Sequence, residues 1–405
     1  MKRVFRIGGG LFIYSIIPIL SWITLSFVLK DSRIINVFSI IYPIQFLWSI
    51  LRLMFASGAN IRKEREKDPN AVWNGIFWGT IFAAIIFAIP LVFVDKFILF
   101  MGQDPAVYRI YVIYAIALLF LQVLFSLIIE KLYFEDREKT ANIHLVAFNL
   151  ITFVSIVLLS WLIPNKLIAV LVTLGILLIY IICLYVWQFK KFKIDFKFYR
   201  NFRYESANII SSLAMLIIYL FGFKIAFSAG PEFLAGISIV ALCTDSQWDS
   251  LGAIATIAKI DISKGRYDFR KEVKNAYAYL SVAVTTSVAM TIGLFFANQV
   301  DPRIVFSILA FQVADMLVYP YRQILSAFTQ IEYSATLNTI INLSFEGIRT
   351  VLSVFLLTPY CTQIGQIVQG VFTCVVFTII RIVKYRIVDK KLVVMKKEKK
   401  EDLIF

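Results

Sequence analysis

Apolar runs of about 20 residues, separated by short stretches rich in charge, proline or glycine, recur along the whole chain. A run of this length crosses the hydrocarbon core of a bilayer as an α-helix, because each residue adds about 1.5 Å. The pattern therefore predicts an all-α integral membrane protein with twelve transmembrane helices. The predicted helices span residues 8–29, 35–57, 72–94, 107–129, 142–163, 167–187, 206–228, 233–257, 276–297, 303–327, 335–357 and 362–384.

The composition indicates a chain that lies almost entirely in the bilayer. Of its 405 residues, 60% are hydrophobic and 17% are charged, and the mean hydropathy is +0.80. Such values exceed those of water-soluble domains and leave no stretch for a catalytic ectodomain. No nucleophile–base pair, set of metal ligands or nucleotide-binding motif stands out in the sequence. We therefore predict no enzyme activity, no metal site and no organic cofactor.

The basic residues are distributed unevenly between the connections. Most of the 41 Lys and Arg residues lie in the amino tail, the even-numbered connections and the carboxyl tail. By the positive-inside rule these segments and both termini are cytoplasmic, so the net charge of +15 reflects the topology of a multi-pass cell membrane protein. We therefore expect membrane lipids, and no nucleic acid, as partners. The opposite connections hold only Lys30, Arg33, Lys96, Lys166 and Arg303.

The two halves of the chain resemble each other. "FSIIYPIQFLWSILRLMFASG" aligns with "ISIVALCTDSQWDSLGAIATIA" so that Trp48 meets Trp248, and "GQDPAVYRI" resembles "NQVDPRIVF". Because six crossings return the chain to its starting side, the halves are predicted to form two lobes related by a pseudo-twofold axis along the membrane normal. The predicted units are an amino-terminal lobe at 1–187, a basic cytoplasmic linker at 188–205, a carboxyl-terminal lobe at 206–384 and a basic cytoplasmic tail at 385–405.

Charged residues inside the predicted helices concentrate in the carboxyl half. The amino half has no acidic residue inside a predicted helix, and only Arg52 and Arg109 toward helix ends. Each charge at a helix centre costs about 2.5–3.5 kcal/mol, so the buried charges must face one another or water. The stretch "IVALCTDSQWDSLGAIA" places two aspartates four residues apart on one helix face, where they repel each other. The carboxyl-half charges are Lys224, Asp245, Asp249, Asp315, Arg322, Glu346 and Arg349.

Four carboxylates against three bases leave one acid unmatched if all seven charges meet in one cluster. An unmatched acid is a candidate for coupling to H⁺ or Na⁺, because its charge selects between two packings of the lobe. The alternative is a set of static ion pairs that holds the helices together. The coupling candidates are Asp245, Asp249, Asp315 and Glu346. The candidate charge partners or substrate contacts are Lys224, Arg322, Arg349 and Arg52, and the candidate hinge is Pro320.

The layout and several local motifs resemble the multidrug and toxic compound extrusion (MATE) family, within the wider group that includes polysaccharide and lipid-precursor flippases. The basic connections "ASGANIRKEREKDPNA" and "IAKIDISKGRYDFRKEVKNA" are similar to MATE connections, whereas the charged loop of major facilitators is missing. The stretch "FQVADMLVYPYRQILSAF" resembles the tenth MATE helix, which implies that Asp315 takes part in cation or proton coupling. The sequence departs from the family in its first helix, which has Pro18 but no aspartate, and at Met215, near where many members carry a glutamate.

The resemblance implies a secondary active transporter, expected to be monomeric, that exports an amphipathic organic solute or drug by H⁺ or Na⁺ antiport with alternating access. A second interpretation is a flippase for a lipid-linked, phosphate-bearing glycan precursor, in which the basic residues named above contact phosphate. A drug-sized cavity with aromatic walls favours export. A basic groove reached through a lateral gate between the lobes favours flipping.

Overall fold

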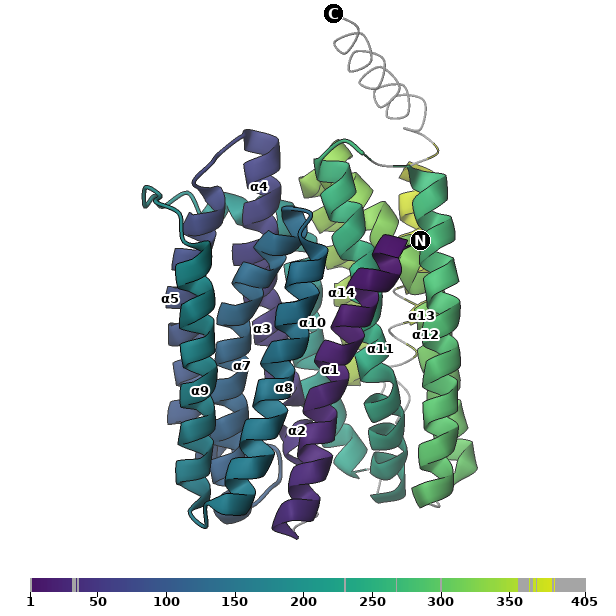
Figure 1. The fold of residues 1–405 in the computed structure, drawn as a ribbon. Coiled ribbons are helices and arrows are strands. Elements are labelled where there is room, and N and C mark those ends of the chain that lie inside the picture. Colours follow the sequence, from purple (N-terminus) through teal and green to yellow (C-terminus); the bar gives the residue numbers. More distant parts are fainter. Residues whose placement is uncertain are drawn as a thin grey trace, which may run out of the picture.

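The regular structure of the chain is helical throughout the part that the computed structural model describes. That part comprises residues 2–30, 34, 36–228, 231–266, 268–298, 301–355, 364, 367–368, 370–380 and 382. Within it, eight helices are long and apolar enough to cross a membrane. Figure 1 shows long, roughly parallel helices gathered into two groups, so the predicted all-α, two-lobed fold class is confirmed.

The amino half contains six helical spans, the second of which is broken into short elements. Pro43 lacks the N–H that an α-helix needs, and the backbone tightens there into a 3₁₀ turn. A wider π turn follows between Leu53 and Ser57. The elements are α1 (Lys2–Leu29), α2 (Asn36–Ile41), η2 (Tyr42–Ile44), α3 (Gln45–Arg52), η3 (Leu53–Ser57), α4 (Gly58–Glu66), α5 (Ala71–Val92), α6 (Val94–Phe100), α7 (Pro105–Phe134), α8 (Glu138–Leu162) and α9 (Lys166–Gln188).

The carboxyl half repeats this order of spans. The Asp-Pro pairs that relate the halves are helix starts: Asp104 and Asp301 each accept a hydrogen bond from a backbone N–H of the first turn, and a proline follows each of them. The elements are α10 (Tyr199–Ser228), α11 (Pro231–Ser263), α12 (Phe269–Asn298), α13 (Pro302–Phe328), η4 (Thr329–Tyr333), α14 (Ala335–Phe355) and the helical segment Gly370–Ile380.

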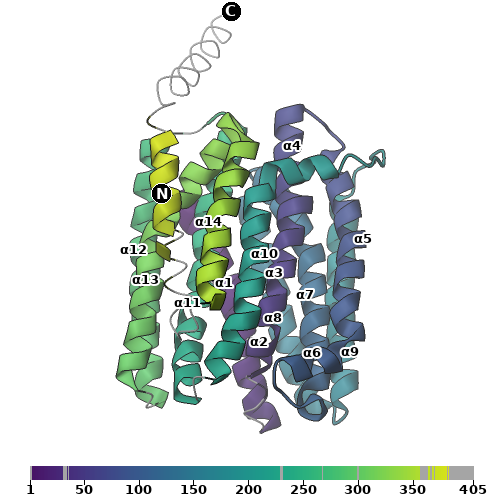
Figure 2. The same cartoon turned by 180° about the vertical axis from the view of Figure 1, so that it is seen from behind.

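The packing of the helices follows the predicted pseudo-twofold relation. The first helix of the amino half, α1, packs against α8 of its own lobe and α11 of the other lobe. The first helix of the carboxyl half, α10, packs correspondingly against α14 of its own lobe and against α3, η3 and α4 of the other. Figures 1 and 2 show α1 and α10 between the two groups of helices. The first and second spans of each half therefore build the lobe interface.

A close backbone approach marks this interface. A Cβ atom at Gly58, the first residue of α4, would lie 2.6 Å from the carbonyl oxygen of Asn201 in α10. No Cβ tolerates that distance without movement of the backbone, so glycine lets α4 and α10 pack at this separation.

Several helices extend beyond their predicted bounds. The linker predicted at 188–205 is shorter, because α10 begins at Tyr199, and α12 begins at Phe269 instead of 276. The second span continues to Glu66 and α11 continues to Ser263. Hydropathy reports where the hydrocarbon ends, whereas Lys, Arg and Glu are good helix formers that continue a helix into the polar layer.

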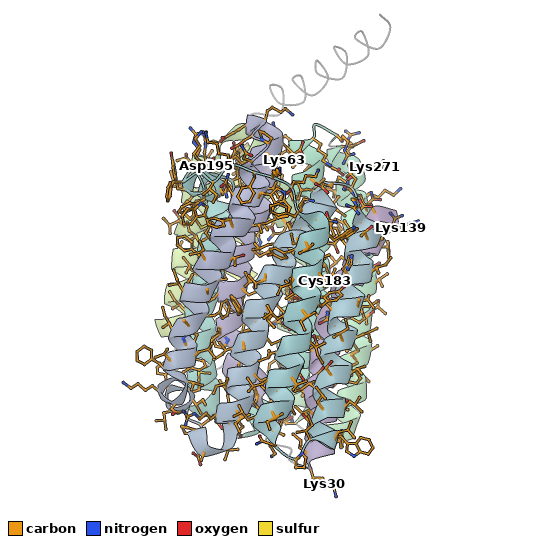
Figure 3. The ribbon with its side chains drawn as sticks, turned by 60° about the vertical axis from the view of Figure 1, so that its left-hand side comes forward. Lys30, Lys63, Lys139, Cys183, Asp195 and Lys271 are labelled. Carbon is orange, nitrogen blue, oxygen red and sulfur yellow. The ribbon has the colours of Figure 1, made fainter. Side chains whose placement is uncertain are left out.

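Basic residues from alternate connections of the chain lie at opposite ends of the helical bundle. Figure 3 shows Lys63, Lys139 and Lys271 at one end of the molecule and Lys30 at the other. We call the end that carries Lys63, Lys139 and Lys271 the basic end.

Candidate functional site

A cavity of about 300 Å³ lies between the two lobes. Its walls come mainly from the second span of the amino half and from α10, α11 and α13 of the carboxyl half. Aromatic side chains from both lobes, Trp48 and Trp248 among them, line it together with polar and charged groups. The charged residues that line the cavity are Arg52, Glu130, Asp245, Asp249, Lys259 and Arg322.

Asp245 and Asp249 lie on one face of α11, as their spacing predicts, and contact the opposite lobe. The Tyr42 hydroxyl donates a hydrogen bond of 2.9 Å to Asp245, and the Ser15 hydroxyl donates to Asp249. In the described part of the chain, no basic nitrogen lies within 4.0 Å of either carboxylate. Hydroxyl groups of the amino lobe, rather than cations, therefore bond this pair.

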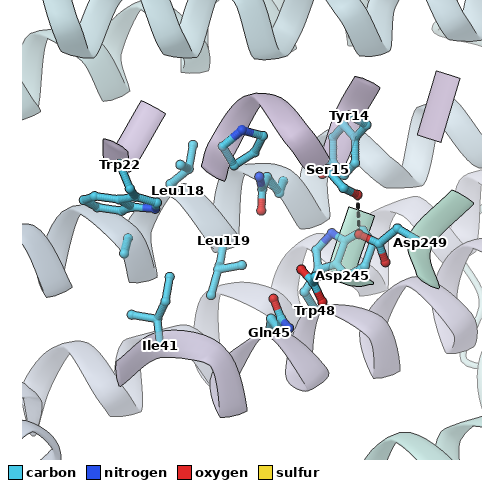
Figure 4. Close-up of a pocket in the computed structure, with 13 residues that line it drawn as sticks. Tyr14, Ser15, Trp22, Ile41, Gln45, Trp48, Leu118, Leu119, Asp245 and Asp249 are labelled. Carbon is cyan, nitrogen blue, oxygen red and sulfur yellow. Dashed lines mark hydrogen bonds between the residues drawn. The ribbon is translucent and has the colours of Figure 1, made fainter. Parts of the chain in front are cut away.

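A second, smaller chamber of about 90 Å³ adjoins the main cavity at the same carboxylates. Tyr14, Gln45, Trp48 and the two aspartates line both spaces and form the partition between them. Figure 4 shows Ser15 bonded to Asp249 at one end of this chamber, with Trp22 and Leu118 at the other. The chamber is therefore acidic at its mouth and apolar at its far end.

The pseudo-twofold relation places different charges on the two walls. Residues at corresponding positions of the aligned spans line the same cavity. The acids of α11, however, correspond to neutral polar residues in the amino half. Arg52, in turn, corresponds to a glycine. The amino wall carries Gln45, Trp48, Ser49 and Arg52, and the carboxyl wall carries Asp245, Trp248, Asp249 and Gly252.

Two ion pairs lie toward the basic end of the cavity. Arg52 lies 3.6 Å from Glu130, and Lys259 lies 2.8 Å from Glu205. Glu205 is completely buried and also accepts hydrogen bonds from Ser57 of the amino lobe and Asn208. These pairs therefore connect the second span of the amino half with α7, α10 and α11.

Sequence reasoning missed three members of these pairs. The hydropathy pattern predicts no acid inside a helix of the amino half, but Glu130 is buried within α7. The apolar run ends at 129, whereas the helix continues to Phe134. Lys259 follows the predicted helix 233–257, and Glu205 is the last residue of the predicted linker 188–205, for the same reason. The helical spacing of apolar positions continues through these charged residues, and this periodicity is the pattern that could have placed them inside helices.

The other predicted residues lie behind the cavity wall or beyond the described side chains. Arg322 lines the cavity and lies over the Tyr319 ring at 5.6 Å, while Asp315 is buried in α13 and does not line the cavity. Pro320 is buried inside the same helix. Glu346 is buried and accepts a hydrogen bond of 2.6 Å from Ser211, which does line the cavity. The side chains of Lys224 and Arg349 lie outside the described part of the structure.

Asp315 and Arg322 come close to each other beside the last helical segment. A Cβ atom at Gly370 would lie 3.3 Å from Asp315 Oδ1 and 3.6 Å from Arg322 Nη1. Arg322 therefore extends from the cavity toward the buried acid. Among the described residues, no group of three His, Cys, Asp or Glu side chains is placed to hold a metal ion.

Ion pairs join the lobes at the basic end. Arg3 of α1 lies 2.5 Å from Glu138 of α8 and 2.5 Å from Asp261 of α11. Asp136, between α7 and α8, lies 2.9 Å from Lys264 and 3.0 Å from Arg266, which follow α11. We call these six residues the interlobe clamp. Partial burial raises the pKa of Asp136, but hydrogen bonds and charge from Arg266 and Lys264 outweigh this effect and hold the pKa below its usual range.

Comparison with known proteins gives a match at the level of structure. No protein-family profile and no curated protein sequence matches the chain. The chain is similar to an outward-facing multidrug resistance MATE family transporter of the MOP superfamily, with a TM-score of 0.69, 16% identity and 96% of each chain covered.

Two further solved structures give similar values. A MATE protein in the straight conformation gives a TM-score of 0.66 at 15% identity, with 96% of this chain and 97% of the other covered. A MOP superfamily transporter from Pyrococcus furiosus, whose binding pocket is described as having reverse polarity, gives 0.68 at 13% identity over 95% and 96%. These similarities confirm the resemblance inferred from the sequence: the chain has the fold of the MATE transporters of the MOP superfamily.

Proposed function

We propose that the protein is a secondary transporter that exports an amphipathic organic solute by alternating access, in exchange for H⁺ or Na⁺. The fold of MATE transporters, a cavity between two lobes and ion pairs that join the lobes at one end support this proposal. In the proposal the basic end and both termini face the cytoplasm, and the protein acts as a monomer in the cell membrane.

The carboxylate pair on α11 is the observation that carries the proposal. Asp245 and Asp249 belong to the carboxyl lobe, whereas the hydroxyl groups that bond them belong to the amino lobe. A cation that enters between the two acids reduces their mutual repulsion and competes for the oxygens that the hydroxyls hold. Binding or release of a proton or Na⁺ therefore changes the attraction between the lobes, which is the requirement for coupling an ion to a rearrangement.

Asp315 and Glu346 are proposed to extend this coupling into the carboxyl lobe. Each is buried and lies one residue away from the cavity, since Arg322 and Ser211 intervene. A change in charge at either acid would alter the position of a cavity-lining side chain.

The walls of the cavity suit an amphipathic solute. Tyr42, Phe46 and Tyr219 form one aromatic cluster, with ring centroids 4.9–5.9 Å apart. Aromatic side chains bind apolar surfaces and attract cations to their faces. A volume of about 300 Å³ lies at the lower end of the range for small-molecule pockets.

One observation favours the flippase alternative. Arg52 and Arg322 line the cavity and offer guanidinium groups that suit phosphate. The same cavity holds Asp245 and Asp249, which have no basic nitrogen within 4.0 Å among the described residues and therefore repel a phosphate. Export of an organic solute is therefore the better-supported function.

Transport by the purified protein in proteoliposomes tests the proposal. We expect ethidium, a fluorescent amphipathic cation, to move against its concentration gradient when a pH or Na⁺ gradient is imposed, and Asp249→Asn to abolish this movement. Transport that is independent of both gradients would contradict antiport. Movement of a fluorescent lipid-linked pyrophosphate, with no movement of ethidium, would favour the flippase.

A further inference from the structure

We infer that the cavity binds a zwitterionic solute, whose ammonium group contacts Asp245 and Asp249 on the carboxyl wall and whose carboxylate contacts Arg52 on the amino wall. This inference rests on the proposed function, since it names the class of solute for the same cavity.

Arg52 is the first observation. Its closest acid, Glu130, lies 3.6 Å away, which is longer than a hydrogen bond. Its Nε is buried and has no hydrogen-bond acceptor among the described residues. The guanidinium lies over the Trp48 ring at 5.1 Å, at the wall of the cavity, and the side chain is 25% exposed. A guanidinium presents five N–H donors in a planar fork that fits a carboxylate, and among the described residues Glu130 meets this fork only at ion-pair distance.

Two further donors surround Arg52. Trp48 Nε1 and the Tyr14 hydroxyl are buried, and neither has a hydrogen-bond partner in the part of the chain that the structure describes. Tyr14 is only 8% exposed and stacks on Trp48 with ring centroids 6.4 Å apart. Buried polar groups without partners are rare in native proteins and require an explanation. Both side chains line the cavity, so a ligand acceptor that displaces the stacked rings would provide one.

The opposite wall has the complementary chemistry. The carboxylates of Asp245 and Asp249 accept hydrogen bonds from hydroxyls and have no basic nitrogen within 4.0 Å among the described residues. Asp249 is exposed to the cavity although it lies mid-helix. An ammonium group supplies the positive charge that the described residues do not place beside this pair.

The internal repeat sets the relative depth of the two poles of the proposed site, which are Arg52 on the amino wall and the two aspartates on the carboxyl wall. Arg52 corresponds to Gly252, which lies three residues beyond Asp249 on α11, or about 4.5 Å along the helix axis. The poles therefore line the same cavity and differ in depth by less than one helical turn. An ammonium and a carboxylate separated by a few bonds can contact both poles, whereas a simple cation or a simple anion can contact only one of them.

Three probes that differ only in their charged groups test the inference: phenylalanine, its amide and N-acetylphenylalanine. Binding is measured on the full-length protein in nanodiscs, without any ion gradient, by calorimetry. We expect phenylalanine to bind about tenfold tighter than either derivative, since each derivative loses one charge-assisted contact. Equal affinity for phenylalanine and its amide would overturn the inference.

Variants assign the two poles. Arg52→Gln should abolish the preference for phenylalanine over the amide, and Asp249→Asn should abolish the preference over N-acetylphenylalanine. Because Arg52→Gln leaves Glu130 without its neighbour, the double variant Arg52→Gln/Glu130→Gln checks that charge imbalance is not the cause. Arg109→Gln, at an exposed pair with Asp95, is the matched control. An unchanged preference for phenylalanine in both Arg52 variants would refute the assignment. If the unsubstituted protein shows the expected preference but no gradient-driven transport, only the proposed function is contradicted.

Discussion

Replacing Lys259 with Met should be among the most damaging single changes at the lobe interface. Lys259 Nζ lies 2.8 Å from Glu205, whose side chain is completely inaccessible, and the Lys259 side chain is only 8% exposed. Methionine keeps most of the volume but leaves the Glu205 carboxylate buried without a counter-charge. Removing one partner of a buried ion pair costs about 3–5 kcal/mol. Ser57 and Asn208 still donate to Glu205 in the variant, so we expect a loss at the lower end, about 3 kcal/mol.

The free energy of unfolding of the purified protein in mild detergent measures this loss, with tryptophan fluorescence as the signal. Arg109→Met is the control: its pair with Asp95 is 3.5 Å long and about half exposed, so removing it should cost less than about 1 kcal/mol. The double variant Lys259→Met/Glu205→Gln removes both charges and should recover at least half of the loss. A Lys259→Met loss no larger than that of the control, or no recovery in the double variant, would show that the pair is not electrostatically isolated from water.

Three further outcomes are expected. Asp315→Asn should abolish gradient-driven transport in proteoliposomes while the folded protein still binds solute, because it removes a buried charge next to Arg322 and keeps the shape; unchanged transport would place Asp315 in a static framework. Gly58→Ala should lower the free energy of unfolding by about 1–3 kcal/mol, since its Cβ would lie 2.6 Å from the Asn201 oxygen, whereas Gly9→Ala meets nothing within 4 Å and should have little effect. Because the pKa of Asp136 is lowered, the clamp contribution of this residue is present above the usual Asp pKa of about 4 and is lost only as the pH falls through the lowered value. The distance between spin labels at positions 139 and 271 should therefore stay constant from about pH 8 to pH 5, while Asp136→Asn should lengthen it at every pH.

The spans and the two-lobed fold were predictable because both follow from short-range constraints. The thickness of the hydrocarbon core sets the length of an apolar run, and the repeat is visible in local pairs such as Asp104-Pro105 and Asp301-Pro302. The structure shows that these pairs are helix caps, which depend only on residues a few positions apart.

The partners of the buried charges were not predictable in the same way. The hydroxyl donors Ser15 and Tyr42 lie more than 200 positions from the aspartates that they bond, and nothing in their local sequence distinguishes them from other polar residues of the helices. Glu130 and Lys259 were missed because hydropathy ends a span at its first charges, whereas the helix and its cavity-facing side continue beyond them.

The unequal walls of the cavity have a consequence for how such a chain diverges. Two halves that descend from one duplicated segment start with identical residues at corresponding positions, so every charge would first appear twice, once on each wall. Here one or two base changes per codon separate Gln45 and Ser49 from the aspartates opposite, and Arg52 from Gly252. The charge of each cavity wall can therefore change, or be redesigned, by point substitutions on a single helix face, while the helix packing common to both halves stays as it was.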